Sequence, residues 1–139
     1  MERSVIIILF VLLIGCKRNN DAYQQIPNVA INETVYLSQP QFFDLGVVNG
    51  WVYLNSGSKG IILFRKSLDE FKAYERHSPF QSTASCAIIN VDSVNLVGVE
   101  QCENSTYSLQ NGTVLSGPAS LPLLEYQVTK SGDVLQIIN

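Results

Sequence analysis

Histidine and cysteine are scarce in this chain of 139 residues, which contains one His and three Cys. So few nitrogen and sulfur ligands restrict metal chemistry severely. Charged residues are also few, at 15% against the roughly 25% typical of soluble domains, so much of the surface must be Ser, Asn, Gln, Thr and Gly. Lys and Arg number 9 against 12 Asp and Glu, a net charge of −3. Without a basic excess, the chain gives no electrostatic reason to expect a nucleic acid partner.

Long apolar runs are missing as well. Residues 5–14 form an apolar run of ten, whereas a membrane-spanning helix needs about 20, so the run suits the central region of a secretory signal. It ends in Leu13-Ile14-Gly15-Cys16, which resembles the bacterial lipobox. That resemblance implies a lipoprotein signal peptide over residues 1–15 and an acylated Cys16 as the first mature residue. The alternatives are a plain signal peptide with a fortuitous Cys, and a short buried strand.

Two or three acyl chains on Cys16 would hold the protein stably on a lipid membrane, because a single chain binds only weakly and reversibly. Residues 17–25 are polar and without periodicity, so we expect residues 16–25 to form the lipidated Cys and a flexible tether. The domain is then residues 26–139, and the length allows one domain with a hydrophobic core. Export would place it in the cell envelope, in the periplasm or at the cell surface.

From residue 28 onward the pattern predicts an all-β domain, because β-branched and aromatic alternation is common and helical periodicity is scarce. The expected strands are residues 29–31, 34–37, 50–54, 60–64, 71–76, 87–91, 95–99, 123–128 and 134–137. Turn sequences at 111–112 and 131–133 favour hairpins. Residues 40–45 are the exception and fit a single helical turn. Many short strands with Gly-containing turns indicate a sandwich or a small barrel.

Three segments, in order, resemble the Rieske iron–sulfur domain. AYERHSPF at 73–80 resembles the strand that leads into the family's Cys-Pro-His, and YSLQNG at 107–112 resembles its aromatic-x-Leu-x-x-Gly hairpin. GPASLPLLEY at 117–126 is close to the Gly-Pro-Ala-x-x-Pro-Leu-x-x-Tyr stretch that closes such domains, and it is the most specific match. The resemblance implies a Rieske-like antiparallel β-sandwich or small barrel. It is closest to small envelope lipoproteins that share this domain without its cluster.

The family's cofactor is a [2Fe–2S] cluster held by two Cys and two His. The resemblance places Ser78 and Phe80 at the first Cys and His positions, and Glu100 and Glu103 at the second pair. A shift by two residues brings Cys102 to a ligand position but replaces the His by a Ser. One His cannot supply two ligands, and acylation of Cys16 leaves two Cys. The chain is therefore expected to be cluster-free, with no cofactor and no metal.

The remaining polar residues leave alternatives open. Cys86 and Cys102 would form a disulfide in an oxidising compartment, or would remain as buried free thiols. His77 could join them in a three-ligand metal site, although no short ligand spacing supports it. Glu100 and Glu103 could act as an acid–base pair, but we expect a solvated pair. Ser78 has no base, since the adjacent His77 side chain points to the opposite face of a strand.

Three functional hypotheses follow. The leading one is a non-enzymatic envelope lipoprotein whose domain is a binding or structural module, with an unidentified envelope protein as partner. The alternative is a [2Fe–2S] electron-transfer protein with unusual ligands, or with ligands shared in a dimer. The third is a hydrolase or other enzyme, which would need a concave pocket with a perturbed acid or base. The sequence leaves the oligomeric state open.

Overall fold

A computed structural model of the chain describes residues 26–139. The expected signal peptide, Cys16 and the tether lie outside the described residues. None of the helical segments in the described part is long and apolar enough to cross a membrane. The elements, in order, are β1 (Asn32–Tyr36), η2 (Pro40–Gly46), β2 (Trp51–Leu54), β3 (Ile61–Arg65), β4 (Phe71–Glu75), β5 (Ile89–Asp92), β6 (Val97–Glu100), β7 (Thr106–Ser108), β8 (Val114–Ser116), β9 (Glu125–Ser131) and β10 (Val134–Ile138).

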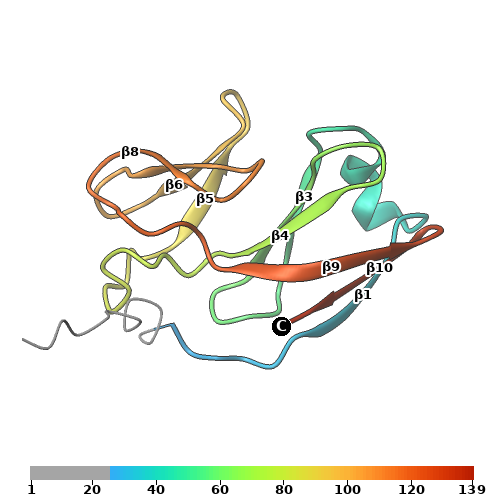
Figure 1. Cartoon of the computed structure of the whole chain (residues 1–139), viewed down its shortest axis with the longest axis horizontal. Coiled ribbons are helices and arrows are strands. Elements are labelled where there is room, and N and C mark those ends of the chain that lie inside the picture. The colour runs from blue at the N-terminus through green and yellow to red at the C-terminus, as the bar shows by residue number, and fades with distance from the viewer. Residues whose placement is uncertain (1–25) are drawn as a thin grey trace, which may run out of the picture.

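The strands form two antiparallel sheets, which confirms the all-β expectation (Figure 1). The larger sheet has six strands in the order β1-β10-β9-β4-β3-β2, and the smaller has four in the order β5-β6-β7-β8. The smaller sheet is therefore an insertion between β4 and β9, which pair with each other. The chain leaves the large sheet after Glu75, builds the small sheet, and returns at Glu125.

The larger sheet curls around one hydrophobic cluster. Val35 of β1 and Leu54 of β2, the two edge strands, belong to the same cluster as Ile61 and Leu63 of β3, the strand next to β2. Leu45 of η2 closes it. A flat sheet would hold its two edge strands far apart, so a shared cluster requires curvature.

A second cluster fills the space between the two sheets. Ile62 and Phe64 of β3 point into it, opposite to Ile61 and Leu63, and meet Ile89 and Tyr107 from the small sheet. All four apolar residues of β3 are fully buried. A strand covered on both faces is a continuous apolar run, which is why the sequence here reads IILF without alternation.

Residues 29–31 do not form the expected strand. The side chain of Asn139 replaces a ladder there, since its Oδ1 accepts a hydrogen bond from Ile31 N at 3.0 Å and its Nδ2 donates to Val29 O at 2.7 Å. The short strands β7 and β8 were not expected as strands, although their connection lies at the predicted turn at 111–112. The helical turn expected at 40–45 is present as the 3₁₀ segment η2.

Arg76 joins the two sheets. Its Nε donates to Ile89 O at 3.0 Å, and its Nη2 donates to Asn90 Oδ1 at 2.6 Å. The guanidinium lies 3.7 Å from the ring centroid of Tyr53, whose hydroxyl accepts a hydrogen bond from Val91 N. One cation thus links β5 of the small sheet to the side chain of Tyr53 in β2 of the large one.

Substitution Arg76→Ala is expected to lower the free energy of unfolding by about 2 kcal/mol, because two charge-assisted hydrogen bonds and a cation–π contact are lost. Arg76→Lys should recover less than half of this, since an ammonium cannot reproduce the planar fork. Urea unfolding followed by circular dichroism measures the change. Lys130→Ala removes only an exposed pair with Asp69 and serves as the control, with an expected change of less than about 0.5 kcal/mol. Equal losses for Arg76→Ala and the control would contradict the prediction.

Candidate functional site

The two loops that resemble cluster-binding loops lie against each other at the end of the small sheet. Residues 76–88 connect β4 to β5, and residues 101–105 connect β6 to β7. Cys86 and Cys102 are joined by a disulfide with a Cα–Cα distance of 5.2 Å, so the structure has the bonded form of the two open alternatives. Gln101 N also donates to Ile88 O at 3.2 Å. A covalent bond and a backbone hydrogen bond thus join the two loops.

Ser78 and Phe80, at the first pair of degenerate positions, serve the local fold. Ser78 is fully buried, its Oγ accepts a hydrogen bond from Phe80 N at 3.1 Å, and its own N–H donates to Ala87 O. The ring of Phe80 is half-buried and packs against the cluster between the sheets. The serine hydroxyl closes a turn, and the phenyl ring fills apolar space.

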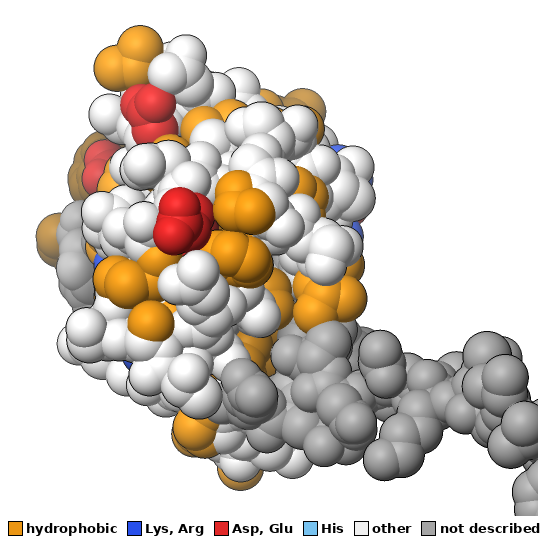
Figure 2. All heavy atoms as spheres, turned by 90° about the vertical axis from the view of Figure 1, so that its left-hand side faces the viewer, with side chains coloured by type: hydrophobic (Ala, Val, Ile, Leu, Met, Phe, Trp, Pro, Cys, Tyr) orange, Lys and Arg blue, Asp and Glu red, His pale blue; other side chains and the backbone are white. Residues whose placement is uncertain are grey.

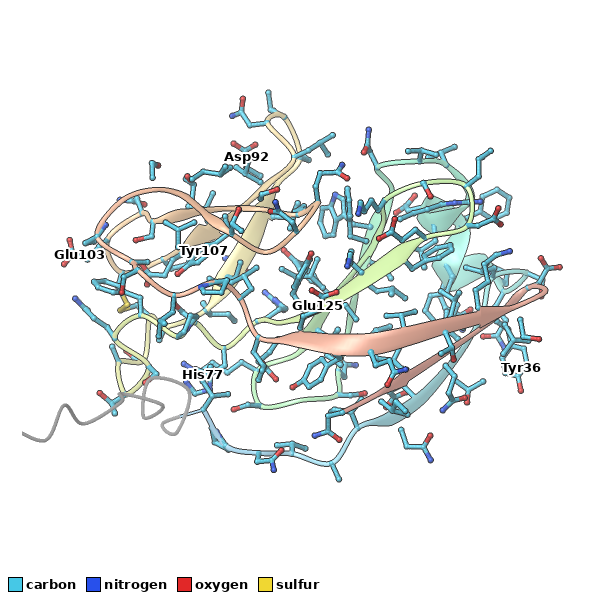
Figure 3. The ribbon with its side chains drawn as sticks, viewed as in Figure 1. Tyr36, His77, Asp92, Glu103, Tyr107 and Glu125 are labelled. Carbon is cyan, nitrogen blue, oxygen red and sulfur yellow. A yellow bond between two sulfur atoms is a disulfide. The ribbon has the colours of Figure 1, made fainter. Side chains whose placement is uncertain are left out.

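Glu100 and Glu103, at the second pair, have unlike environments, and the expectation of a solvated pair is wrong for Glu100. Its side chain is fully buried, with Oε1 accepting from Cys102 N at 2.6 Å and Oε2 accepting from Glu103 N at 2.8 Å. Burial of this carboxylate is compensated because it accepts hydrogen bonds from two backbone N–H groups of the turn that follows β6. The side chain of Glu103 is exposed at the outer end of the small sheet (Figure 3).

His77 is a buried hydrogen-bonded loop residue, with 6% of its surface exposed. Its Nε2 lies 2.7 Å from Ser82 O, and its Nδ1 lies 2.8 Å from Ser58 Oγ. A carbonyl can only accept, so Nε2 carries the proton, and in the neutral ring Nδ1 accepts from the Ser58 hydroxyl. Figure 2 views the small-sheet end, where the visible described side chains are mainly hydrophobic or uncharged polar, with a few acidic ones. Both ring nitrogens are therefore used within the protein.

These residues do not fit a [2Fe–2S] cluster. The sulfur atoms of Cys86 and Cys102 are bonded to each other, and both ring nitrogens of His77 form hydrogen bonds within the protein. The oxygens of Ser78 and Glu100 accept backbone N–H groups. Within residues 26–139 no group of three or more His, Cys, Asp and Glu side chains is arranged to hold a metal ion. His77, Cys86 and Cys102 therefore do not form the three-ligand site that was one of the alternatives.

A second buried carboxylate, Glu75, is not among the candidate residues predicted from the sequence. It is fully buried at the end of β4 and accepts four hydrogen bonds. The donors are the N–H groups of Ser58 at 2.8 Å, Lys59 at 3.0 Å and His77 at 2.8 Å, and the hydroxyl of Tyr126 at 2.8 Å. A signal was available, because Glu75 is in phase with the apolar Phe71 and Ala73 on one face of a strand.

The loop between β2 and β3 folds onto this carboxylate. Gly57 has a φ of +85°, and a Cβ there would lie 2.5 Å from Glu75 Oε2, so only glycine allows the close approach. Lys59 Nζ reaches across to Ala87 O at 2.9 Å, in the loop between β4 and β5. Ser58, from the same loop, holds His77. Glu75, Ser58, Lys59 and His77 thus form one hydrogen-bonded network, which fixes the β2–β3 loop against the β4–β5 loop.

Burial raises the pKa of Tyr126 above its ordinary value of about 10, and the hydrogen bond to Glu75 adds to the effect. Burial likewise raises the pKa of Tyr74, with the charges of Glu125 and Glu70 as smaller causes. The Tyr74 hydroxyl has no hydrogen-bond partner among the described residues. Ionisation of either phenol would place a negative charge in a low-dielectric site, and for Tyr126 this charge would lie beside the Glu75 carboxylate.

The free energy of unfolding should therefore be pH-dependent in the alkaline range. A tyrosine whose pKa is raised on folding keeps its proton where the unfolded chain has lost it, so stability is complete below pH of about 10 and falls as the pH rises further. Urea unfolding at several pH values between about 8 and 11.5 would show this slope. Tyr126→Phe and Tyr74→Phe should each make it shallower, whereas Tyr36→Phe, at an exposed site, should leave it as in the wild type. Equal slopes in all four proteins would contradict the assignment.

No protein-family model matches the chain, and no curated protein matches it. Among solved structures, the fold is similar to that of the plasma membrane Rieske protein PetC3 of the cyanobacterium Synechocystis PCC 6803, with a TM-score of 0.58 and 19% sequence identity. The similarity covers 78% of this chain and 99% of that one. At this identity the likeness shows the fold, and it confirms that the described domain has the Rieske-like all-β architecture.

Proposed function

We propose that this chain is a membrane-anchored bacterial lipoprotein whose Rieske-like domain works without an iron–sulfur cluster, as a non-enzymatic binding or structural module of the cell envelope. One observation carries the proposal. At the positions that correspond to the cluster ligands, Ser78 and Glu100 accept backbone hydrogen bonds and Phe80 fills apolar space, while the neighbouring cysteines form a disulfide. These residues hold the loops together directly, which is a task that a cluster would otherwise share.

Three further observations support an envelope location. The segment Leu13-Ile14-Gly15-Cys16 is the pattern expected of an acylated lipoprotein. A disulfide between Cys86 and Cys102 is stable in the oxidising compartments to which such proteins are exported. The similar structure belongs to a protein described as a plasma membrane Rieske protein.

The proposal is tested by iron and acid-labile sulfide analysis, with a visible spectrum, on the full chain extracted from membranes in detergent under anaerobic conditions. We expect a colourless, folded protein without stoichiometric iron. Two irons and two sulfides per chain or per dimer would overturn the proposal and establish the alternative, a [2Fe–2S] electron-transfer protein with unusual or shared ligands. Mass spectrometry of the same sample tests the anchor, because acylation should be present in the wild type and absent from Cys16→Ala.

A further inference from the structure

The edge strand β2 is the least protected sheet edge in the described part of the chain. It is the last strand of the six-stranded sheet, and its four residues read WVYL, with no charge and no proline. Natural sheets protect their edges with charged residues, proline or very short strands. The opposite edge strand β1 carries Glu33, and β5 in the small sheet carries Asp92. β8 has three residues and leads into Gly117-Pro118.

The backbone groups that β2 presents outward can be identified from the ladder. Arg76 N donates to Gly60 O, and Arg65 N donates to Gly50 O, so the odd-numbered residues Ile61, Leu63 and Arg65 turn their backbone groups toward β2. Their partners in β2 are Leu54 and Val52. Because direction alternates along a strand, the N–H and C=O groups of Trp51 and Tyr53 point away from the sheet.

A hollow of about 520 Å³ runs along this edge. One wall is formed by β2 from Trp51 to Tyr53, and the other by Gln41, Asp44 and Val47 of η2 and the turn after it. The rings of Trp51 and Tyr53 lie 4.9 Å apart on one face of the strand. Arg76 lies over the Tyr53 ring, but 38% of the Tyr53 surface stays exposed, and β-branched or aromatic side chains of an added strand would pack against this exposed part.

The charge of the hollow indicates what would fit. Asp44 is the only charged residue in its lining, it is exposed, and it forms no ion pair within residues 26–139. Gly50 packs directly against the backbone of Asp44, so this carboxylate lies near the start of β2. Val47 lines the hollow with 65% of its surface exposed. Phe43, in η2, has 80% of its surface exposed. The hollow therefore combines open backbone groups, apolar surface and one unpaired negative charge.

We propose that β2 binds an extended segment of a partner protein, which adds as a further antiparallel strand and places a Lys or Arg beside Asp44. This is recognition by strand addition, in which backbone hydrogen bonds supply affinity and side chains select the sequence. The inference rests on the proposed function and names the partner class of the binding module. In Figure 1, η2 lies at the end of the molecule opposite to the start of the described chain, where the tether would attach, so a membrane anchor would leave the hollow accessible.

The chain carries its own reporter, because Trp51 in β2 is its only tryptophan. The test uses the full chain in mild detergent and the synthetic peptide acetyl-Thr-Val-Lys-Val-Thr-Val-Thr-amide, which has β-branched residues and one cation but no tryptophan. We expect saturable change in Trp51 fluorescence, and slower amide exchange at Trp51 and Tyr53. Methylating alternate peptide nitrogens should abolish binding in one of the two alternating patterns and spare it in the other, since only one set faces β2.

Charge reversal tests the partner chemistry. Asp44→Lys should weaken binding of the lysine peptide by about tenfold and strengthen binding of the same peptide with Glu in place of Lys. Asp133→Lys, an exposed position outside this hollow, should leave both affinities unchanged. No fluorescence change up to about 1 mM peptide, or protection of β1 in place of β2, would overturn the proposal. So would a dimer of the chain that buries β2, shown by analytical ultracentrifugation.

The two proposals fail separately. An iron-free protein that does not bind the peptide would overturn strand addition and leave the cluster-free module standing. A protein that contains iron and sulfide but binds the peptide at β2 would overturn the proposed function and leave the binding edge standing.

Discussion

Replacement of Glu75 by alanine is expected to lower the free energy of unfolding by about 4 kcal/mol. The change leaves four donors without an acceptor, three of them backbone N–H groups, and two of the four are buried. Each such donor costs about 1–3 kcal/mol when water cannot replace the lost partner. A domain of this size has only about 5–15 kcal/mol in total, so the variant should lose a large fraction of its stability.

A graded series keeps this prediction testable even where the alanine variant does not fold. Tyr126→Phe removes one donor and should cost about 1 kcal/mol. Glu75→Gln keeps one carbonyl oxygen, which can serve Lys59 N and His77 N, but places an amide opposite Ser58 N, so its loss should lie between those of the other two. Urea unfolding followed by circular dichroism gives the three values. A loss below about 1 kcal/mol for Glu75→Gln and Glu75→Ala alike would show that the carboxylate is not an essential acceptor.

The strands of the large sheet could be predicted because their patterns are local. The IILF run of β3 indicates a strand that is buried on both faces. The two-residue connection between Ser131 and Val134 indicates the hairpin of β9 and β10. The resemblance at residues 117–126 indicated the architecture that the structural comparison confirms. The strand predicted at residues 29–31 is wrong because the apolar pattern suggested pairing in a sheet. The side chain of Asn139, more than a hundred positions away, supplies hydrogen bonds to this segment instead.

The buried carboxylates could be predicted only in part. Glu75 is in phase with apolar neighbours, but its donors at Ser58 and Lys59 come from a loop whose return over β4 no local pattern reveals. Glu100 appeared as half of a solvated pair because sequence spacing cannot show that two N–H groups of the following turn point back at it. Burial of an acid depends on donors supplied by the folded backbone, and composition does not contain that information.

Removal of the disulfide by Cys86→Ala with Cys102→Ala should lower the free energy of unfolding by about 3 kcal/mol. The cross-link closes a loop with a sequence separation of 16, and a loop of about this length restricts the unfolded chain by roughly that amount. Cys16 is left in place, so acylation is unaffected by the change. Unfolding of the wild type with and without a dithiol reductant provides a matched measurement on the same chain.

The disulfide and Glu100 should be coupled, because both act on the turn that contains Cys102. The Glu100 carboxylate accepts a hydrogen bond from Cys102 N, and the sulfur of Cys102 is bonded to that of Cys86. Glu100→Gln should therefore cost more in the cross-linked protein, where the turn is held in place around a poor acceptor, than in the double alanine variant, where the turn can move to water. A double-mutant cycle gives this coupling, expected at about 1 kcal/mol. Additive losses would mean that the carboxylate and the cross-link stabilise the degenerate loops independently, and either one could then vary without the other.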